Sequence, residues 1–219
     1  MNRVLVTGAN RGIGLELCRQ LVARGDELIA VCRKNSDALT ALNVQVIEGI
    51  DVSNTELVRD LSLKLGQLAL DWVINNAGIL SVESLSTLDF DAMERQFRVN
   101  ALGPLRITSA LLPNLSAGSK VAIVTSRMGS IEDNTSGGYY GYRMSKAAVN
   151  MAGMSLSRDL KARGIAVALL HPGMVATEMT GQQGIAPEHA AAGLIARMDE
   201  LDLDSSGAFW HAEGERLPW

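Results

Sequence analysis

Arg3-Val4-Leu5-Val6-Thr7-Gly8-Ala9-Asn10-Arg11-Gly12-Ile13-Gly14 places a β-branched run directly before a glycine turn. The run Arg3–Thr7 predicts a short buried strand. Residues 15–24 have the apolar periodicity of a helix, and Gly25 after them is typical of a helix end. A strand, a glycine turn and a helix in this order predict an α/β fold with a phosphate-binding element at its first junction.

The glycines of this turn follow the spacing G-x-x-x-G-x-G rather than the common G-x-G-x-x-G. Glycine lets the backbone approach a pyrophosphate closely, and a helix N-terminus offers unpaired N–H groups. The same glycines could serve only the turn, but the position at the first strand–helix junction favours a dinucleotide. The residues expected to hold it are Gly8, Asn10, Arg11, Gly12, Ile13 and Gly14.

Outward from this stretch, apolar strands alternate with amphipathic helices to the end of the chain. Further strands are expected at 27–32, 44–48, 71–74, 120–125, 165–170 and 207–211, and the longer helices at 55–65, 89–112, 143–163 and 187–200. Such alternation predicts a Rossmann fold, a doubly wound seven-stranded parallel sheet with helices on both faces. No linker or repeat divides residues 1–219, so we expect a single domain, with ligands bound past the carboxyl ends of the strands.

The end of the second strand indicates which dinucleotide is bound. An NAD site usually has Asp or Glu about 20 residues after the turn, to bond the ribose 2′-OH. Here Arg33 stands at that point and no carboxylate occurs until Asp37. Arg33 and Arg11 suit a 2′-phosphate, although both could be solvated surface residues. We therefore predict NADP(H) rather than NAD(H).

Polar and turn residues follow the other strands in the same way. Asp51-Val52 follows the third strand, and the Asp51 carboxylate could accept a hydrogen bond from the adenine amino group or simply begin a turn. Asn76-Ala77-Gly78 after the fourth strand and Pro172-Gly173 after the sixth are typical of strand exits. Each of these residues could also be a plain turn residue. The further residues expected at the cofactor are Asp51, Val52, Asn76, Ala77, Gly78, Pro172, Gly173, Val175 and Thr177.

All three tyrosines lie between Tyr139 and Tyr142, and only Tyr142 has a lysine, Lys146, four residues on. In a helix these two side chains share one face, although Tyr-x-x-x-Lys also arises by chance. Free tyrosine titrates near pH 10, so a working pKa near 7 requires about 4 kcal/mol. An ammonium about 5 Å away, at an effective dielectric of about 20, supplies roughly 3 kcal/mol. The pair predicts a phenol acidified by its lysine.

Composition excludes several classes of function. The chain has 219 residues, 47% of them apolar and 20% charged, with a net charge of −4. There is no basic surface for nucleic acid and no apolar run that could span a bilayer. Cys18 and Cys32 fit neither a metal site nor a disulfide framework, which favours a cytoplasmic protein. No metal is expected, and we interpret His171, His189 and His211 as structural or surface residues.

These motifs together resemble the short-chain dehydrogenases/reductases. The resemblance covers nearly the whole chain. It rests on Thr7–Gly14, 75–78, Asn100, Ser126, Tyr142-x-x-x-Lys146 and Pro172-Gly173. The runs 126–130 and 207–219 are similar to those of C-factor-like and sniffer-type carbonyl reductases. The resemblance implies an NADPH-dependent oxidoreductase acting on a carbonyl or alcohol substrate.

The resemblance also implies the catalytic roles. Tyr142 would act as general acid or base, and Lys146 would lower its pKa and hold the nicotinamide ribose. Ser126 would polarise the substrate carbonyl, and Asn100 would bind a water that connects Lys146 to solvent. Asn100 could otherwise be a surface asparagine in the helical stretch 89–112. Sixteen residues separate Ser126 from Tyr142, longer than usual in the family, which makes Ser130 a rival for the serine role.

Two functions of different class remain open. The chain could be the oxidoreductase, or it could keep the fold and the cofactor site and act by binding, as a C-factor-type signalling or redox-sensing protein. The family commonly forms homodimers or homotetramers through the helices that correspond here to 93–112 and 143–163.

Overall fold

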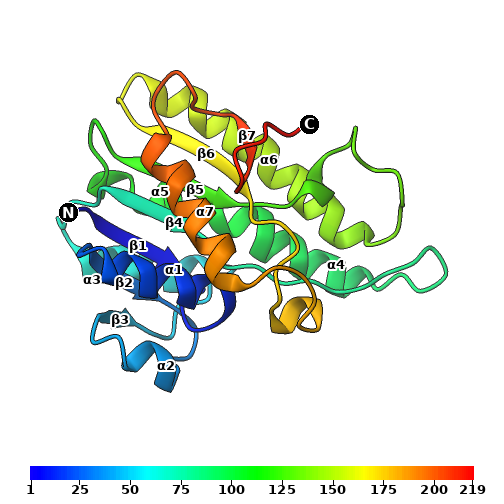
Figure 1. The fold of residues 1–219 in the computed structure, drawn as a ribbon, viewed down its shortest axis with the longest axis horizontal. Coiled ribbons are helices and arrows are strands. Elements are labelled where there is room, and N and C mark those ends of the chain that lie inside the picture. The colour runs from blue at the N-terminus through cyan, green and yellow to red at the C-terminus, as the bar shows by residue number, and fades with distance from the viewer.

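The computed structural model describes residues 1–219 and contains one sheet of seven parallel strands in the order β3-β2-β1-β4-β5-β6-β7 (Figure 1). This confirms the predicted fold class. The order reverses between β1 and β4, so the segments that follow these two strands flank the point where such sheets bind ligands. The strands are β1 (Arg3–Thr7), β2 (Glu27–Val31), β3 (Gln45–Ile47), β4 (Trp72–Asn75), β5 (Lys120–Val124), β6 (Ala166–His171) and β7 (Phe209–His211).

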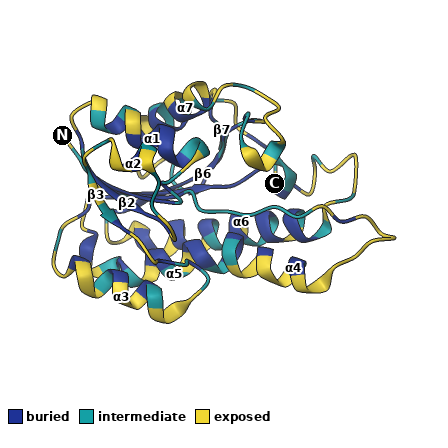
Figure 2. Cartoon of the chain, turned by 90° about the horizontal axis from the view of Figure 1, so that it is seen from below, coloured by how far each residue is buried: buried dark blue, intermediate teal, exposed yellow.

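Helices cover both faces of the sheet (Figure 2). One face carries α1 (Gly12–Ala23), α2 (Asp37–Thr40) and α7 (Pro187–Glu200). The other carries α3 (Thr55–Leu65), α4 (Phe90–Gln96), α5 (Gly103–Ala110) and α6 (Tyr140–Lys161). Because both faces are covered, the strands are apolar throughout rather than alternately polar.

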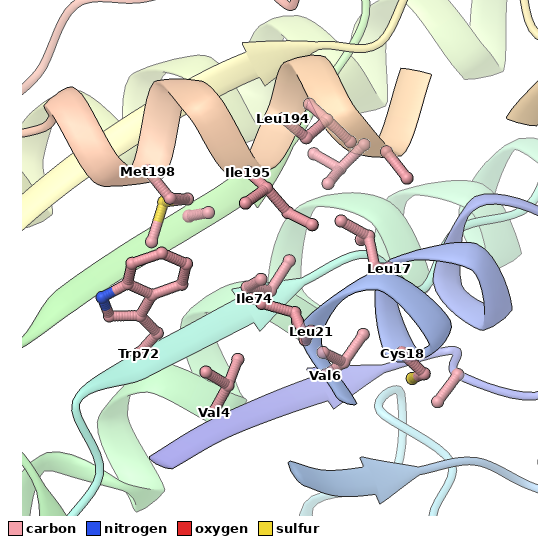
Figure 3. Packing of buried hydrophobic residues seen from close by; sticks show 14 of the residues in the cluster. Val4, Val6, Leu17, Cys18, Leu21, Trp72, Ile74, Leu194, Ile195 and Met198 are labelled. Atoms are coloured by element: carbon pink, nitrogen blue, oxygen red, sulfur yellow. The ribbon is translucent and has the colours of Figure 1, made fainter. Parts of the chain in front are cut away.

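Alternate strand residues divide the core into two clusters. On the α1/α7 face, 24 buried residues pack together, and Figure 3 shows Val4, Val6 and Ile74 of the sheet beneath Leu21 and Ile195 of the helices. The opposite face holds 22 buried residues, with Leu5, Val73 and Ile123 of the strands packed against α3, α5 and α6. The two clusters fix the sheet rigidly, and the loops at its carboxyl edge carry the polar side chains.

The structure refines the predicted elements. Helix α1 begins at Gly12, so the last two glycines of the turn belong to its first turn. Asn54 caps α3 with its side chain. The short helix α2 was not expected from the sequence. None of the helices has both the length and the apolar character needed to cross a membrane.

The prediction of one continuous helix at 89–112 is wrong in detail. This stretch consists of α4, a π-helical segment Phe97–Leu102 and α5. The π-helical segment contains Asn100, whose side chain bonds outside the helix, and π-bulges are frequent at functional sites. Residues 178–186 contain a 3-10 turn, Glu178–Thr180, and Ile185 pairs with Val175.

Candidate active site

The ends of β1 and β4 are joined directly at the switch point. Thr7 Oγ1 accepts hydrogen bonds from the backbone N–H groups of Asn76 and Ala77, both at 3.1 Å. Asn76 Nδ2 donates in return to Thr7 O at 3.1 Å and to Gly8 O at 3.3 Å. The predicted residues Asn76 and Ala77 therefore support the glycine turn through hydrogen bonds. Thr7 belongs to the sequence motif, but no role was assigned to it from the sequence.

The glycine turn has no room for side chains. A Cβ on Gly14 would overlap Gly8 O, and a Cβ on Gly8 would lie 2.9 Å from Ala77 Cα. Gly8 has φ +67 and Gly12 has φ +54, a left-handed conformation that favours glycine. The backbone at this turn is consequently bare, which is the requirement for close approach of a pyrophosphate.

Helix α1 directs its N-terminus toward this bare backbone. Its N-cap residue, Arg11, is extended and makes no capping side-chain bond. The first N–H groups of a helix have no acceptor within it, so those of Gly12, Ile13 and Gly14 suit an anion. The Arg11 guanidinium is exposed and pairs with the Glu178 carboxylate. Asn10 O accepts from Ser36 Oγ at 2.8 Å, which ties the turn to α2.

Arg33 and Asp51 lie at the carboxyl ends of β2 and β3, as predicted. Burial raises the pKa of Asp51, but hydrogen bonds from Ser53 and the charges of Arg33 and Arg106 lower it by more. The pKa of Asp51 therefore lies below its usual value. Asp51 Oδ1 accepts from Ser53 N at 2.8 Å and from Ser53 Oγ at 2.7 Å, which is the turn expected as one alternative. The next residue, Val52, is buried against Gly103.

Asn100 links the π-helical segment to the loop after β4. Its Oδ1 accepts from Ile79 N at 2.9 Å, and its Nδ2 donates to Ile79 O at 2.8 Å and to Ser145 Oγ at 3.0 Å. A side chain that bonds a neighbouring backbone on both edges rules out the alternative of a surface asparagine. A Cβ on Gly78 would lie 3.4 Å from Asn100 Oδ1 and 3.8 Å from Lys146 Nζ, so Asn100 and Lys146 meet across Gly78.

Lys146 is a buried ammonium, 5% exposed. Its Nζ donates to Val124 O at 3.0 Å, at the end of β5. Burial lowers the pKa of Lys146 to about 8. The residue therefore keeps its charge at neutral pH but loses it more easily than a surface lysine.

Tyr142 lies in the first turn of α6 with Lys146 beside it, and Lys146 Nζ is 5.6 Å from the centroid of the tyrosine ring. Burial raises the pKa of Tyr142 to about 12, and a hydrogen bond with Ser126 lowers it. The direction opposes the sequence expectation of an acidified phenol. That expectation counted the attraction of the ammonium but omitted the cost of burying a phenolate on a side chain that is 8% exposed.

The two candidate serines differ in their surroundings. Ser126 follows β5 and bonds Tyr142, and its Oγ accepts from Met128 N at 3.2 Å. Ser130 Oγ accepts from Asp133 N at 3.1 Å and is 2% exposed. The bond to Tyr142 favours Ser126 for the substrate.

Asn150, which the sequence interpretation missed, holds this loop in place. It accepts from Thr125 Oγ1 at 2.7 Å and donates to Gly129 O at 3.4 Å, so it spans the segment around Ser126. Its position four residues after Lys146, inside a helix, was an available signal because asparagine is a poor helix former.

The segment after β6 closes the other side of the site. Thr177 Cγ2 would lie 3.3 Å from a Cβ on Gly12, so this segment faces the α1 turn. Thr180 Oγ1 donates to Val175 O at 2.6 Å and forms a capping box with Thr177. Pro172 is buried, and Gly173 has φ +86. The chain thus brings all the predicted residues to one edge of the sheet.

His171, at the end of β6, contacts His211 edge to face, with ring centroids 5.1 Å apart. Burial first, then the charges of His211, Arg127 and Lys146, lower the pKa of His171 to about 3. His171 is therefore neutral at physiological pH. His189 is exposed, with its Nε2 3.8 Å from Glu213 Oε1.

Comparison with known proteins agrees with this geometry. Residues 2–187 match the family model of the short chain dehydrogenases. A 1-hydroxy-2-glutathionyl-2-methyl-3-butene dehydrogenase of Rhodococcus sp. (strain AD45) is 46% identical, with full coverage of both chains. The C-signal protein of Myxococcus xanthus is 47% identical over 68% of this chain and 93% of its own length.

Solved structures give the same assignment. The NADPH-bound carbonyl reductase from chicken fatty liver is 28% identical with a TM-score of 0.91, covering 100% of this chain and 99% of its own. The carbonyl reductase Sniffer of D. melanogaster is 29% identical with a TM-score of 0.92 and full coverage of both chains. With the family model, the relatives and the structures in agreement, this chain belongs to the short-chain dehydrogenases/reductases, as an NAD(P)-dependent oxidoreductase of the C-factor and sniffer type.

Proposed function

We propose that this protein uses NADPH to reduce an aldehyde or ketone to an alcohol, or catalyses the reverse, with Tyr142 as the proton donor. The observation that carries the proposal is the convergence of the Tyr142 phenol, the Ser126 hydroxyl and the Lys146 ammonium at the edge of the sheet that also carries the bare glycine turn. When bound, the reduced nicotinamide supplies the hydride. A protein that acts only by binding has no use for a buried tyrosine–lysine pair.

Each polar side chain has one task in this scheme. Ser126 Oγ donates a hydrogen bond to the substrate carbonyl, and Tyr142 Oη transfers its proton to the same oxygen as the C–H bond forms. The Lys146 ammonium stabilises the resulting phenolate and holds the nicotinamide ribose. Asn100 Oδ1 retains one lone pair for a water that returns a proton from solvent toward Lys146.

The preference for NADPH rests on Arg33 and Arg11, with Asp51 near the adenine. The cation of Arg33 stands where an NAD enzyme would place a carboxylate. The related chicken structure contains NADPH. The ratio of kcat/KM for NADPH to that for NADH tests this preference, and a ratio below one would contradict it.

Replacement of Tyr142 by Phe tests the mechanism. We expect Tyr142→Phe to lower kcat by about 10²- to 10⁴-fold, the usual worth of a positioned general acid, with NADPH affinity kept. NADPH oxidation would be followed with a panel of aldehydes, ketones and quinones, and NADP⁺ reduction with alcohols that include a glutathione-conjugated allylic alcohol, suggested by the name of the Rhodococcus relative.

The matched control is Tyr140→Phe, which removes a phenol two residues away on the same helix. If the wild type turns over a substrate and both variants lose the same share of kcat, the role of Tyr142 is refuted. The same holds if Tyr142→Phe loses no activity. No turnover on the whole panel together with tight NADPH binding would favour the second candidate, a signalling protein. The observation behind that candidate is the 47% identity to C-signal.

We further propose a cytoplasmic homodimer or homotetramer that pairs through residues 93–112 and 143–163. Its support is the apolar surface on these helices, where Phe97, Leu105, Met144 and Met151 are 41%, 39%, 56% and 68% exposed. Free Cys18 and Cys32 fit a reducing compartment. Light scattering after gel filtration tests the assembly, and a mass of one chain would contradict it.

A further inference from the structure

Glu83 is a buried carboxylate in the loop between β4 and α4, 3% exposed, and all of its partners are neutral donors. Its Oε1 accepts from Ser81 Oγ at 2.5 Å and from Gln96 Nε2 at 2.8 Å. Its Oε2 accepts from the backbone N–H of Gly141 at 3.3 Å. Burying a carboxylate is costly, so a site that provides this many donors is built for an acceptor at that point.

Helix α6 needs such an acceptor because its own cap is absent. The N-cap residue, Tyr139, has φ +51 and makes no capping bond with its side chain. Tyr139 N donates instead to Glu83 O at 2.8 Å. The backbone and the side chain of Glu83 therefore both bind the start of α6, and its charge lies at the positive end of the helix dipole.

The capped turn carries the reactive tyrosine. Gly141, whose N–H Glu83 accepts, immediately precedes Tyr142. Gly141 also packs closely on α4, since a Cβ there would lie 2.7 Å from Met93 Cγ and 2.9 Å from Met93 Cα. The Glu83–Gln96 bond joins the loop to α4 at the same place, so one carboxylate fixes the position of this turn against both elements.

We propose that Glu83 is a positioning residue that holds the first turn of α6, and thereby the Tyr142 phenol, in register with Ser126 and Lys146. The inference rests on the proposed function, because it assigns the purpose of the cap to proton transfer by Tyr142. Glu83 touches neither substrate nor cofactor in this assignment. It acts through Gly141 and Tyr139.

The experiment compares full-length Glu83→Ala and Glu83→Gln with wild type. Glutamine keeps one carbonyl acceptor, enough for Gly141 N or for Gln96 Nε2 but not for both. The matched control is Asp89→Ala, which removes a carboxylate cap at 2.9 Å from Ala92 N on the neighbouring helix α4. Asp89→Ala loses a similar cap without touching α6.

Three measurements are made on each variant. Hydrogen exchange of the Gly141 and Tyr142 amides is expected to accelerate at least tenfold in Glu83→Ala, less in Glu83→Gln, and not at all in Asp89→Ala. The kcat for carbonyl reduction is expected to fall at least tenfold in Glu83→Ala with KM for NADPH within threefold, because misplacement of a reacting group costs rate rather than cofactor affinity. Glu83→Gln should lie between wild type and Glu83→Ala.

The third measurement is spectroscopic. In a Tyr139→Phe, Tyr140→Phe background, Tyr142 is the only tyrosine left. Burial raises the pKa of Tyr142 to about 12, and a loosened turn that admits water should return it toward 10 in Glu83→Ala. Ultraviolet absorbance titration follows this ionisation, and circular dichroism at each pH checks that the variant is still folded, because an unfolded chain would also titrate near 10.

Unchanged amide exchange in Glu83→Ala, or faster exchange with unchanged kcat and unchanged tyrosine titration, would overturn the inference. If Glu83→Ala does not fold, Glu83→Gln decides the same comparison. Absence of turnover in wild type would refute the proposed function instead, and amide exchange and tyrosine titration would still show whether Glu83 holds Tyr142 in place.

Discussion

Burial acts on Tyr142 and Lys146 in opposite directions on the pH scale. It raises the pKa of Tyr142 to about 12 and lowers that of Lys146 to about 8, because both shifts favour the uncharged form. At neutral pH the phenol is therefore protonated and the lysine is still charged. The proposed mechanism requires this pair of states for donating a proton to a carbonyl, and under it reduction is the direction that needs no prior ionisation.

The raised pKa predicts a directional pH dependence. In the proposed mechanism, alcohol oxidation needs the phenolate of Tyr142, whose fraction rises tenfold per pH unit below the pKa. We expect kcat/KM for oxidation, at saturating NADP⁺, to rise with a slope of about one between pH 6 and 7.5, below the pKa of Lys146, while kcat/KM for reduction stays flat. Initial rates in both directions across this range provide the measurement. An oxidation rate that peaks at pH 7 would contradict the assignment.

Lys146 predicts a pH dependence of stability. Between pH 8 and 10.5 the native state has released the lysine proton and the unfolded state retains it, so the unfolded state binds more protons and stability rises with pH. Relative to Lys146→Met, which does not titrate there, wild type should gain up to about 2 kcal/mol in the free energy of unfolding from pH 7 to pH 10. Urea titrations at four pH values measure it. Parallel stability curves for the two proteins would show that the ammonium is not buried.

At the scale of elements, the break between α4 and α5 is the feature that couples the loops to α6. Phe97–Leu102 is π-helical, and the widened turn presents Asn100 to the backbone of Ile79 and to Ser145. The sequence left open whether Asn100 has a task inside the helix or is a surface asparagine. The partners of that asparagine were invisible, because they lie 21 and 45 residues away in the chain.

Loss of this side chain has a predictable cost. Asn100→Ala leaves the N–H and C=O of Ile79 without their partners, and an unsatisfied buried group costs about 1–3 kcal/mol. We expect a decrease of about 2 kcal/mol in unfolding free energy and faster hydrogen exchange at Ile79. The control is Asn134→Ala, which removes an exposed side chain that accepts from Gly137 N and should change stability by less than about 0.5 kcal/mol. Equal losses in the two variants would contradict the assigned role of Asn100.

At the scale of the whole molecule, stability and chemistry occupy opposite edges of the sheet. The carboxyl edge carries the glycine turn, Tyr142 and Lys146. The amino edge carries Trp72, which is 3% exposed and lies against Met198 of α7 (Figure 3). Arg24 Cζ lies 4.7 Å and Lys120 Nζ 5.8 Å from the centroid of the Trp72 ring. Lys120 Nζ also donates to Met198 O and Asp199 O at the end of α7.

This separation predicts that Trp72 affects stability alone. Trp72→Ala should lower the free energy of unfolding by about 3–5 kcal/mol, as large core truncations do, and Trp72→Phe by clearly less. The Kd for NADPH, measured by fluorescence well below the unfolding temperature, should stay within twofold of wild type. A tenfold rise in Kd in the Phe variant would mean that the two edges are coupled.

The sequence by itself determined that the sheet is parallel and which residues are candidates for the site, because apolar periodicity and turn chemistry are local properties of the chain. Strand and helix alternation is sufficient to place Gly8, Arg33, Asn76, Ser126 and Thr177 at the same edge of the sheet. The π-helical segment around Asn100 and the short helix α2 escaped prediction, since propensity does not distinguish such segments from ordinary helix and loop.

Only the tertiary structure decided the protonation of Tyr142 and the partners of Glu83, Asn100 and Asn150. The ammonium four residues along the helix predicted a lowered tyrosine pKa, whereas burial by elements distant in sequence raises it. Burial and long-range hydrogen bonds depend on which segments meet in space. A charge on the same helical face can be read from spacing, but the loss of water around it cannot.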